Sequence, residues 1–272
     1  MAFPPERIVC LTEETVETLY LLGEEARIVG VSGYAVRPPR VRKEKPRVSA
    51  FISADIPKIL ALEPDLVLAF SDLQADIVAG LIREGVAVHA FNQRTVAGIL
   101  DMIRVLAAMV GAQAKGEELA GKLQKRLESV AAAAKSLPRR PKVYFEEWNA
   151  PMISGIGWVS ELIQLAGGID VFASNAARQS AKERIVTEED VIAAGPDIIF
   201  GSWCGKKFRP EQVRARKGFD SIPAVRNGNI FEIKSTIILQ PGPAALTDGL
   251  DAIAEHIRRW AYDHPQKADH GQ

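Results

Sequence analysis

Residues 58–68 read KILALEPDLVL, and 132 positions later residues 190–200 read DVIAAGPDIIF. In both segments a helical pattern precedes a Pro-Asp pair, and an unbroken apolar run follows the pair. Proline ends a helix, Pro-Asp favours a turn, and a short run of Leu, Ile and Val is typical of a buried strand. Each segment is therefore predicted to be the helix, turn and strand of an α/β unit, and the repeat indicates two related lobes.

The same alternation extends along both halves of the chain. In the first half we expect strands at 8–11, 28–31, 66–70 and 86–90, and helices at 13–22, 56–62 and 75–84. In the second half we expect strands at 143–145, 198–200 and 230–233, and helices at 159–166, 188–194 and 243–260. Because strands alternate with helices, the predicted fold class is α/β with mostly parallel sheets.

A long helix is predicted between the two halves. Residues 111–135 contain no proline and are rich in good helix formers, and Leu119, Leu123 and Leu127 form one apolar stripe. About 24 helical residues would span about 36 Å, enough to join two lobes. We therefore expect an N-terminal lobe at 1–110, a linking helix at 111–138 and a C-terminal lobe at 139–272. The alternative is a helix that lies on a single domain.

Composition excludes several classes of protein. Lys plus Arg and Asp plus Glu number 34 each, so no net charge attracts nucleic acid. Apolar residues make up 47% of the chain and charged residues 25%, the ordinary balance of a globular protein. No uninterrupted apolar run approaches 18 residues, so membrane insertion is not expected. The basic stretch at 37–47 is predicted to be a solvated loop, because it has three prolines and no interleaved aromatic residue.

The N-terminus and the cysteines bear on the cellular compartment. Residues 1–7 show no basic region followed by an apolar signal segment, which predicts a cytoplasmic protein as written, or a periplasmic one if a leader had been removed. Cys10 and Cys204 are too few for a disulfide framework and are expected to be free thiols.

Catalytic and metal-binding motifs are missing from the sequence. Residues 201–207, GSWCGKK, lack the spacing of a phosphate-binding loop, and Gly155 and Gly157 lack the third glycine of a dinucleotide site. The Asp-x-His-x-x-Gly motif of corrinoid-dependent enzymes is absent. The histidines show no metal-ligand spacing; they are His89, His256, His264 and His270. We therefore predict no catalytic residue, no catalytic cofactor and no directly bound metal.

Several segments of the chain resemble cobalamin-binding periplasmic proteins. They are residues 7–11, 17–23, 28–34, 48–51 and, most specifically, 59–68, followed by 153–155, 196–199 and 222–228. The chain is thus similar to the cobalamin and iron-siderophore substrate-binding proteins of ABC transporters, which have the class III periplasmic-binding-protein fold, and looks like a member without a signal peptide. The resemblance implies two Rossmann-like lobes joined by one long α-helix, with the ligand in the cleft at the strand ends.

The resemblance also implies which residues touch a ligand. Three aromatic positions of the first lobe carry over: Tyr34, Phe51 and Phe70. From the second lobe we add tryptophans that follow expected strands or start a helix, and nearby polar groups: Trp148, Trp158, Trp203, Cys204, Lys206 and Gln240. Rings at the mouth of a cleft suit a flat conjugated macrocycle. The alternative interpretation is that these rings are core or rim residues.

Family members dock on a permease through one acidic residue per lobe, at the start of the helix before each Pro-Asp strand. Glu189 keeps that position in the second lobe, whereas Pro57 occupies it in the first and Asp55 stands two residues earlier. Proline cannot make the ion pair, which argues against an ABC permease as partner.

The leading hypothesis is reversible, non-enzymatic binding of cobalamin or another corrinoid by a monomer. A ferric siderophore or haem is the nearest alternative, for which Tyr34 is the obvious iron ligand. An enzyme using Glu146, Glu147 and Cys204, and a sensor or scaffold that changes partners when ligand binds, are the alternatives from other classes.

Overall fold

The computed structural model describes residues 3–265, which group into two compact units. The first unit comprises Met1–Gln93 and Ala97–Gln124, and the second comprises Arg94–Val96 and Lys125–Gln272. The chain therefore passes from the first unit to the second within the predicted linking segment. In addition, Arg94–Val96 belong to the second unit, although the segments on either side of them belong to the first. Met1, Ala2 and His270 lie outside the described residues, so nothing tests the expectations placed on them.

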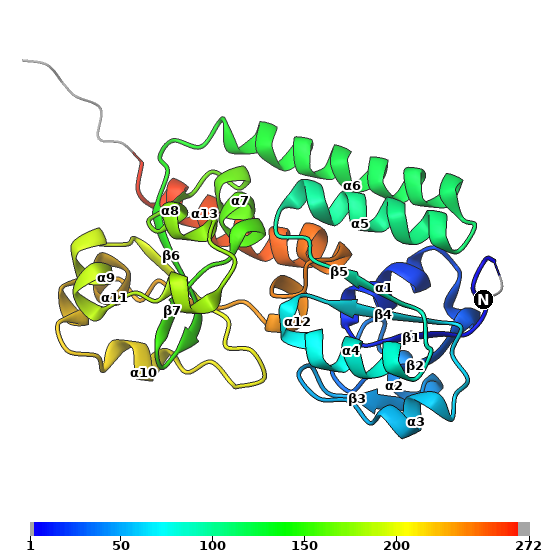
Figure 1. The fold of residues 1–272 in the computed structure, drawn as a ribbon. Helices are drawn as coiled ribbons and strands as arrows, with labels where there is room; N and C mark the ends of the chain where they lie inside the picture. The colour runs from blue at the N-terminus through cyan, green and yellow to red at the C-terminus, as the bar shows by residue number, and fades with distance from the viewer. Residues whose placement is uncertain (1–2, 266–272) are drawn as a thin grey trace, which may run out of the picture. The chain divides into compact units, whose positions relative to one another are not determined.

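The sheet of the first unit has the strand order β3-β2-β1-β4-β5, and its paired strands are parallel (Figure 1). Its strands are β1 (Ile8–Cys10), β2 (Ile28–Ser32), β3 (Arg47–Ser49), β4 (Leu66–Phe70) and β5 (Val88–Phe91). This is the order of a Rossmann half, which confirms the predicted α/β class. β3 was not predicted, because its sequence, Arg47-Val48-Ser49, contains a single apolar residue.

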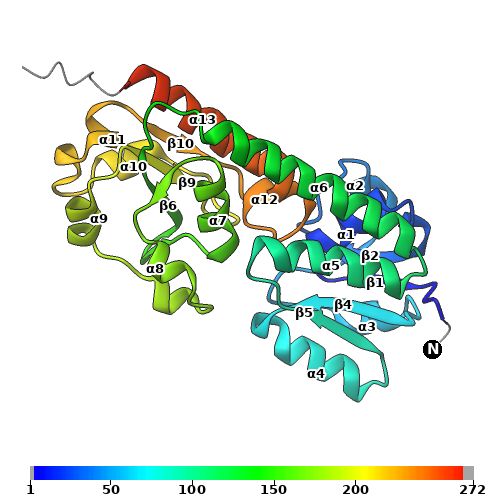
Figure 2. The same cartoon turned by 90° about the horizontal axis from the view of Figure 1, so that it is seen from above.

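Helices cover both faces of this sheet. They are α1 (Glu13–Leu21), α2 (Val41–Glu44), α3 (Ile56–Leu60), α4 (Ala75–Arg83) and α5 (Val96–Met109), with 3-10 turns at Glu25–Arg27 (η1) and Asp72–Gln74 (η2). Ile59 of α3 and Leu81 of α4 belong to one apolar cluster with Val9 and Val67 of the sheet. Figure 2 shows α4 and α5 on opposite sides of β4 and β5. Such two-sided cover explains why β4 is apolar and buried throughout.

The long helix is confirmed as α6, Gln113–Ala134. Its 22 residues correspond to about 33 Å. The boundary between the two units falls inside it, at Gln124. Its first half packs closely on α5, since a Cβ on Gly116 would lie 2.3 Å from the Cβ of Ala107. Figures 1 and 2 both show α5 and α6 side by side.

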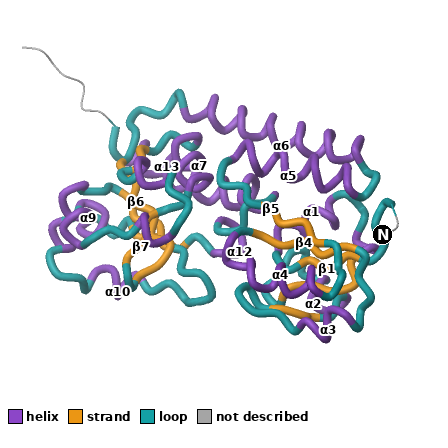
Figure 3. Tube along the Cα trace, in the orientation of Figure 1, coloured by secondary structure: helices purple, strands orange, loops and turns teal. Residues whose placement is uncertain are grey.

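The second unit has the strand order β10-β9-β6-β7, with β8 also paired to β6. Figure 3 labels β6 and β7 among its strands, which are drawn in orange. The strands are β6 (Lys142–Asn149), β7 (Met152–Ser154), β8 (Ile169–Asp170), β9 (Ile198–Gly201) and β10 (Ile230–Glu232). β7 runs antiparallel to β6, and the other pairs are parallel. The sheet is therefore mostly parallel, as predicted.

The helices of the second unit are short, except for the last, α13. They are α7 (Gly157–Leu165), α8 (Ala173–Ala176), α9 (Glu188–Ala194), α10 (Pro210–Arg214), α11 (Pro223–Arg226), α12 (Ser235–Ile238) and α13 (Leu250–Asp263), with 3-10 turns at Ala181–Arg184 (η3) and Phe219–Ser221 (η4). The predicted helix at 243–260 begins with a π-helical turn, Ala245–Gly249, before α13. At Gly249 a Cβ would lie 2.3 Å from the carbonyl oxygen of Ile237, so this turn needs glycine. No helix among residues 3–265 is long and apolar enough to cross a bilayer.

The repeated Pro-Asp pair has the same structural role in both units. The amide of Asp65 donates to the carbonyl of Arg7, and its carboxylate accepts the amides of Glu6 and Arg7 just before β1. The amide of Asp197 donates to the carbonyl of Lys142, and its carboxylate accepts the amide of Lys142 at the start of β6. Each aspartate thus fastens its strand to the strand beside it, which explains the repeat.

The stretch at 37–47 is mostly exposed, as expected, but it is not all loop. It contains α2 and the start of β3, and Arg37, Arg40 and Lys45 have fixed partners. The Arg37 guanidinium lies 2.8 Å from the Glu17 carboxylate, and Lys45 donates to the carbonyls of Glu25 and Ile28. These three positive charges therefore serve local structure, which a count of basic residues could not reveal.

A close approach at the start of α7 gives a test of the packing. At Gly157 a Cβ would lie 2.3 Å from the carbonyl oxygen of Arg94, so Gly157→Ala is expected to lower the free energy of unfolding by about 1–3 kcal/mol. Gly121, inside α6, has nothing within 4 Å of such a Cβ. Gly121→Ala is therefore the matched control and should stabilise by about 0.5–1 kcal/mol. Urea unfolding of both variants checks the prediction, and equal effects would contradict it.

Candidate ligand-binding faces

Three predicted ligand residues come together in the first unit. Tyr34 lies two residues beyond β2, Phe51 two beyond β3, and Phe70 is the last residue of β4. Because these strands are parallel, their carboxyl ends lie at one edge of the sheet, where α/β proteins commonly bind ligands. We call this edge and its loops the first-unit face.

The three rings differ in exposure. Tyr34 is 50% exposed, Phe51 is half-buried, and Phe70 is buried. The ring most available to a ligand is therefore that of Tyr34. Its exposed ring face leaves area that a stacked ligand can bury.

Gln74, which the sequence analysis did not single out, lies at the centre of this face. Its side chain is fully buried at the end of η2. It accepts the amide of Phe70 at 3.0 Å and donates to the carbonyls of Leu11 at 3.3 Å and Phe51 at 2.7 Å. A glutamine between turn residues gives no local sign of contacts this far apart in sequence.

Two buried carboxyl groups start α1, directly beyond β1. Burial raises the pKa of Glu13 to about 7 and that of Glu14 to about 8, and each charge would disfavour its neighbour. The Glu14 carboxyl accepts the hydroxyl of Thr12 at 2.6 Å. Near neutral pH the Glu14 carboxyl is therefore mostly protonated, whereas that of Glu13 is near the midpoint of its titration.

In the second unit, Trp148 and Lys206 meet at the carboxyl ends of β6 and β9. Trp148 is half-buried, Lys206 is exposed, and the ammonium lies 5.5 Å from the ring centroid of Trp148 and 5.2 Å from that of Trp203. The same ammonium donates to the side chain of Asn149 at 3.1 Å. The structure therefore places a cation over aromatic rings at a strand end, an arrangement that is attractive by itself.

Trp158 and Trp203 do not stand exposed as expected. Trp158 is 3% exposed, and its indole N–H donates to the carbonyl of Ile238 at 2.8 Å. Trp203 is 2% exposed, packs edge-on against Phe208, and donates to the carboxylate of Glu146 at 2.9 Å. The alternative interpretation, that these rings are core residues, describes both of them in this structure.

The remaining polar candidates lie outside the helices and strands. Cys204 is exposed in the turn after β9, and Gln240 is half-buried after α12. Cys10, by contrast, is buried in β1, where burial raises its pKa to about 12. Both cysteines are free thiols, as predicted.

The glutamates of the enzyme alternative are held in ion pairs. Glu146 is fully buried and paired with Arg216, so no substrate could reach its carboxylate in this structure. Glu147 is paired with the buried Arg184 at 2.6 Å. Among the described residues no group of three His, Cys, Asp or Glu side chains could hold a metal ion. The carboxylates therefore act as structural partners.

The positions expected to meet a permease lie at helix starts, as predicted. Glu189 is exposed in the first turn of α9. Pro57 is in the first turn of α3, and Asp55 is the N-cap of that helix, where its carboxylate accepts the amide of Lys58 at 3.0 Å. Asp55 therefore already caps a helix.

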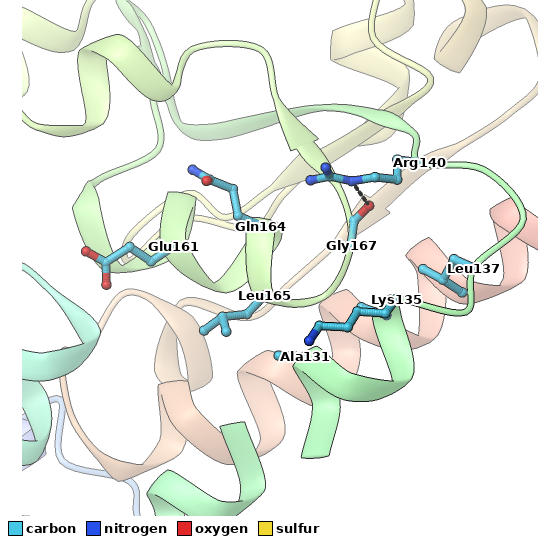
Figure 4. A pocket seen from close by; sticks show the side chains of 9 residues that line it. Ala131, Lys135, Leu137, Arg140, Glu161, Gln164, Leu165 and Gly167 are labelled. Carbon is cyan, nitrogen blue, oxygen red and sulfur yellow. Dashed lines mark hydrogen bonds between the residues drawn. The ribbon is translucent and has the colours of Figure 1, made fainter. Parts of the chain in front are cut away.

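A pocket of about 650 Å³ lies in the second unit, away from the predicted ligand residues (Figure 4). Its walls include Lys135, Arg140, Glu161 and Gln164. The Arg140 guanidinium donates to the carbonyls of Gly167 and Gly168, and Glu161 accepts the amide of Val96. None of the nine predicted ligand residues, all of them within residues 3–265, lines this pocket. Its charged groups mainly serve backbone contacts, so it has no assigned ligand.

Comparison with known proteins adds independent information. The vitamin B12-binding protein of Vibrio cholerae is 26% identical over 264 residues, covering 94% of this chain and 90% of the relative. The ABC transporter substrate-binding lipoprotein YvrC of Bacillus subtilis is 25% identical and covers 93% and 80%.

Solved structures agree with the fold. The periplasmic vitamin B12-binding protein BtuF of Vibrio cholerae gives a TM-score of 0.75 at 25% identity, covering 95% of this chain and 99% of that one. The periplasmic haem-binding protein RhuT of Roseiflexus gives 0.79 at 25% identity, covering 93% and 99%. The family described as periplasmic binding protein matches residues 8–237. The resemblance to the substrate-binding proteins of ABC transporters is thus confirmed, and the chain belongs to the periplasmic binding protein family.

Proposed function

We propose that this protein binds cobalamin or another corrinoid reversibly, as a monomer and without catalysing a reaction. The observation that carries the proposal is the pair of accessible rings at one edge of the first sheet, Tyr34 and Phe51, in a chain similar over 94% of its length to a vitamin B12-binding protein. Phe70, the third ring proposed there, is buried at the end of β4. Flat, apolar macrocycle faces gain both buried area and stacking from such rings. On this proposal the lobes 1–110 and 139–272, joined by the helix at 111–138, hold the ligand through their strand ends.

Titration with cobalamin and cobinamide tests the proposal. All four tryptophans lie in the second unit, so saturable one-to-one quenching of their fluorescence is the expected result. Absence of binding at tens of micromolar of either compound would remove the corrinoid assignment.

Trp148→Ala is expected to weaken corrinoid binding by about 1–3 kcal/mol, because the ring would lose buried area and stacking. The matched control is Trp260→Phe. Trp260, in α13, stacks on His264, which follows that helix. It also lines a pocket with Asn227 and Gly228, which precede β10 and therefore lie at the amino end of that strand. Isothermal calorimetry compares the two variants, and an unchanged affinity for Trp148→Ala would argue against a contact there.

Haem is a second candidate because the half-exposed Tyr34 carries a phenol that could bind ferric iron. Tyr34→Phe distinguishes the two ligands. For haem, loss of the phenolate ligand would change the absorption spectrum of the bound iron. For a corrinoid, the ring remains and both spectrum and affinity should stay close to those of the unmodified protein.

Glu189 is the proposed docking contact if a permease takes part. It is exposed at the start of α9, whereas Pro57 offers no charge at the corresponding place in the first unit. One acidic contact in place of two predicts weak docking, which binding to reconstituted permease, with Glu189→Gln as comparison, would measure.

A further inference from the structure

Gln74 joins the ends of three strands through one side chain. Its amide oxygen accepts the N–H of Phe70, the last residue of β4. Its amide nitrogen donates to the carbonyl of Leu11, just beyond β1, and to that of Phe51, beyond β3. β2 lies between β3 and β1 in the sheet, so the chain after β3 must cross the end of β2 to bring Phe51 to this amide.

The turn that carries Gln74 is strained, and its neighbours hold it. Ser71, directly after Phe70, has φ 60° and ψ 176°, a region that residues other than glycine rarely occupy. Its amide donates to the carbonyl of Phe91 at 2.8 Å, and its hydroxyl accepts the amide of Leu73 at 3.3 Å. Such a backbone persists only where the surroundings fix it, and the bond from Phe70 to Gln74 closes the turn across this residue.

The three bonds are made where water does not compete. Gln74 is fully buried, and a buried carbonyl or amide that loses its partner keeps the full cost of leaving water. Without the amide group, the backbone at Phe51 and Phe70 would therefore move to find other partners. The rings of both residues would move with it.

We propose that Gln74 is a positioning residue of the ligand-binding face, whose amide fixes Phe51 and Phe70 in the binding arrangement before a ligand arrives. This inference rests on the proposed function, since it assigns to Gln74 the placement of Phe51 and Phe70, two of the residues proposed to bind the macrocycle. A preformed face binds more tightly because the free protein already populates the competent state. Gln74 itself need not touch the ligand.

The test compares Gln74→Leu and Gln74→Glu. Gln74→Leu removes all three bonds and is expected to weaken cobalamin or cobinamide binding by about tenfold or more, with slower association because fewer molecules are competent. Gln74→Glu keeps an oxygen that can accept the amide of Phe70. When ionised, however, it places a second carboxylate oxygen opposite the carbonyls of Leu11 and Phe51, where no hydrogen bond can form. A protonated carboxyl can donate to one of them, so its affinity should recover partly between pH 8 and pH 5, while that of Gln74→Leu should not.

A matched control separates positioning from general destabilisation. Leu106→Ala removes a buried side chain of α5 in the same unit and leaves the bonds of Gln74 in place. Its affinity should stay within about twofold of the unmodified protein, since the fold remains populated after a loss of a few kcal/mol. An equal loss of affinity in Leu106→Ala and Gln74→Leu would overturn the inference.

Hydrogen exchange followed by mass spectrometry gives a readout that needs no ligand. In Gln74→Leu, peptides covering residues 50–54 and 68–74 should exchange faster while those of α5 stay unchanged. Unchanged exchange at residues 68–74 would overturn the inference whatever the ligand proves to be. If the unmodified protein binds neither cobalamin nor cobinamide, the corrinoid assignment fails by itself, and the exchange result still decides the role of Gln74.

Discussion

Replacing Arg216 by Met is expected to lower the free energy of unfolding of the second unit by about 3–5 kcal/mol. Glu146 is fully buried, and the two ends of the Arg216 guanidinium lie 2.5 and 2.9 Å from its carboxylate oxygens. The indole of Trp203 and the hydroxyl of Tyr144 also donate to this carboxylate. Burial and the nearby carboxylate keep the pKa of Tyr144 well above its usual value, so the phenol remains a donor. Without Arg216, the buried negative charge loses its counter-ion.

Tryptophan fluorescence during urea unfolding measures this loss, because all four tryptophans report on the second unit. Arg209→Met is the matched control, since the pair of Arg209 with Glu211 is exposed and should contribute less than about 1 kcal/mol. The double variant Glu146→Gln with Arg216→Met should recover part of the loss, because it leaves no buried charge. A loss below about 1 kcal/mol in Arg216→Met would contradict the prediction.

Glu14→Gln is expected to stabilise the first unit by about 4–5 kcal/mol at pH 9 and by less than about 1 kcal/mol at pH 5. Burial raises the pKa of Glu14 to about 8, well above its value of 4.5 in the unfolded chain. Between these values the folded state binds more protons than the unfolded state, so stability falls as pH rises. Glutamine stays neutral and keeps an oxygen that can accept the hydroxyl of Thr12.

Urea unfolding followed by circular dichroism at pH 5, 7 and 9 checks this expectation. Glu84→Gln, at an exposed position beyond α4, should change stability by no more than about 0.5 kcal/mol at each pH. Glu13→Gln should act in the same direction as Glu14→Gln over a lower pH range, since the pKa of Glu13 is raised to about 7. Parallel stability profiles of Glu14→Gln and the unmodified protein would show that the carboxyl is not buried in solution.

The fold was predictable because its signals are local. The repeat around Pro64 and Pro196 marks a helix, a turn and a strand within eleven residues, and the structure has all three in both places. The helix at 111–135 follows equally from composition and spacing. β3 and β8 each contain only one apolar residue and carry no such signal, so their place depends on the neighbours with which they pair.

The binding faces were predictable only in part, because side-chain burial depends on distant segments. Tyr34, Phe51 and Phe70 share an edge since each follows a parallel strand, which the sequence pattern could indicate. The burial of Trp203 depends on Glu146, 57 residues away, and the role of Gln74 on Leu11, 63 residues away. No local pattern encodes such partners, so a tryptophan after a strand looked the same whether it faced water or the core.

The position of Arg94–Val96, between two segments of the first unit, affects folding during translation and the outcome of proteolysis. These residues belong to the second unit, where Gly157 lies against the carbonyl of Arg94 and Glu161 accepts the amide of Val96, 65 residues later in the chain. During translation they leave the ribosome before α7 exists, so their contacts with Gly157 and Glu161 form only after that helix is synthesised. A fragment starting at Lys125 would lack them altogether, and Glu161 would lose the amide it accepts. The second unit is therefore complete only in the uncut chain.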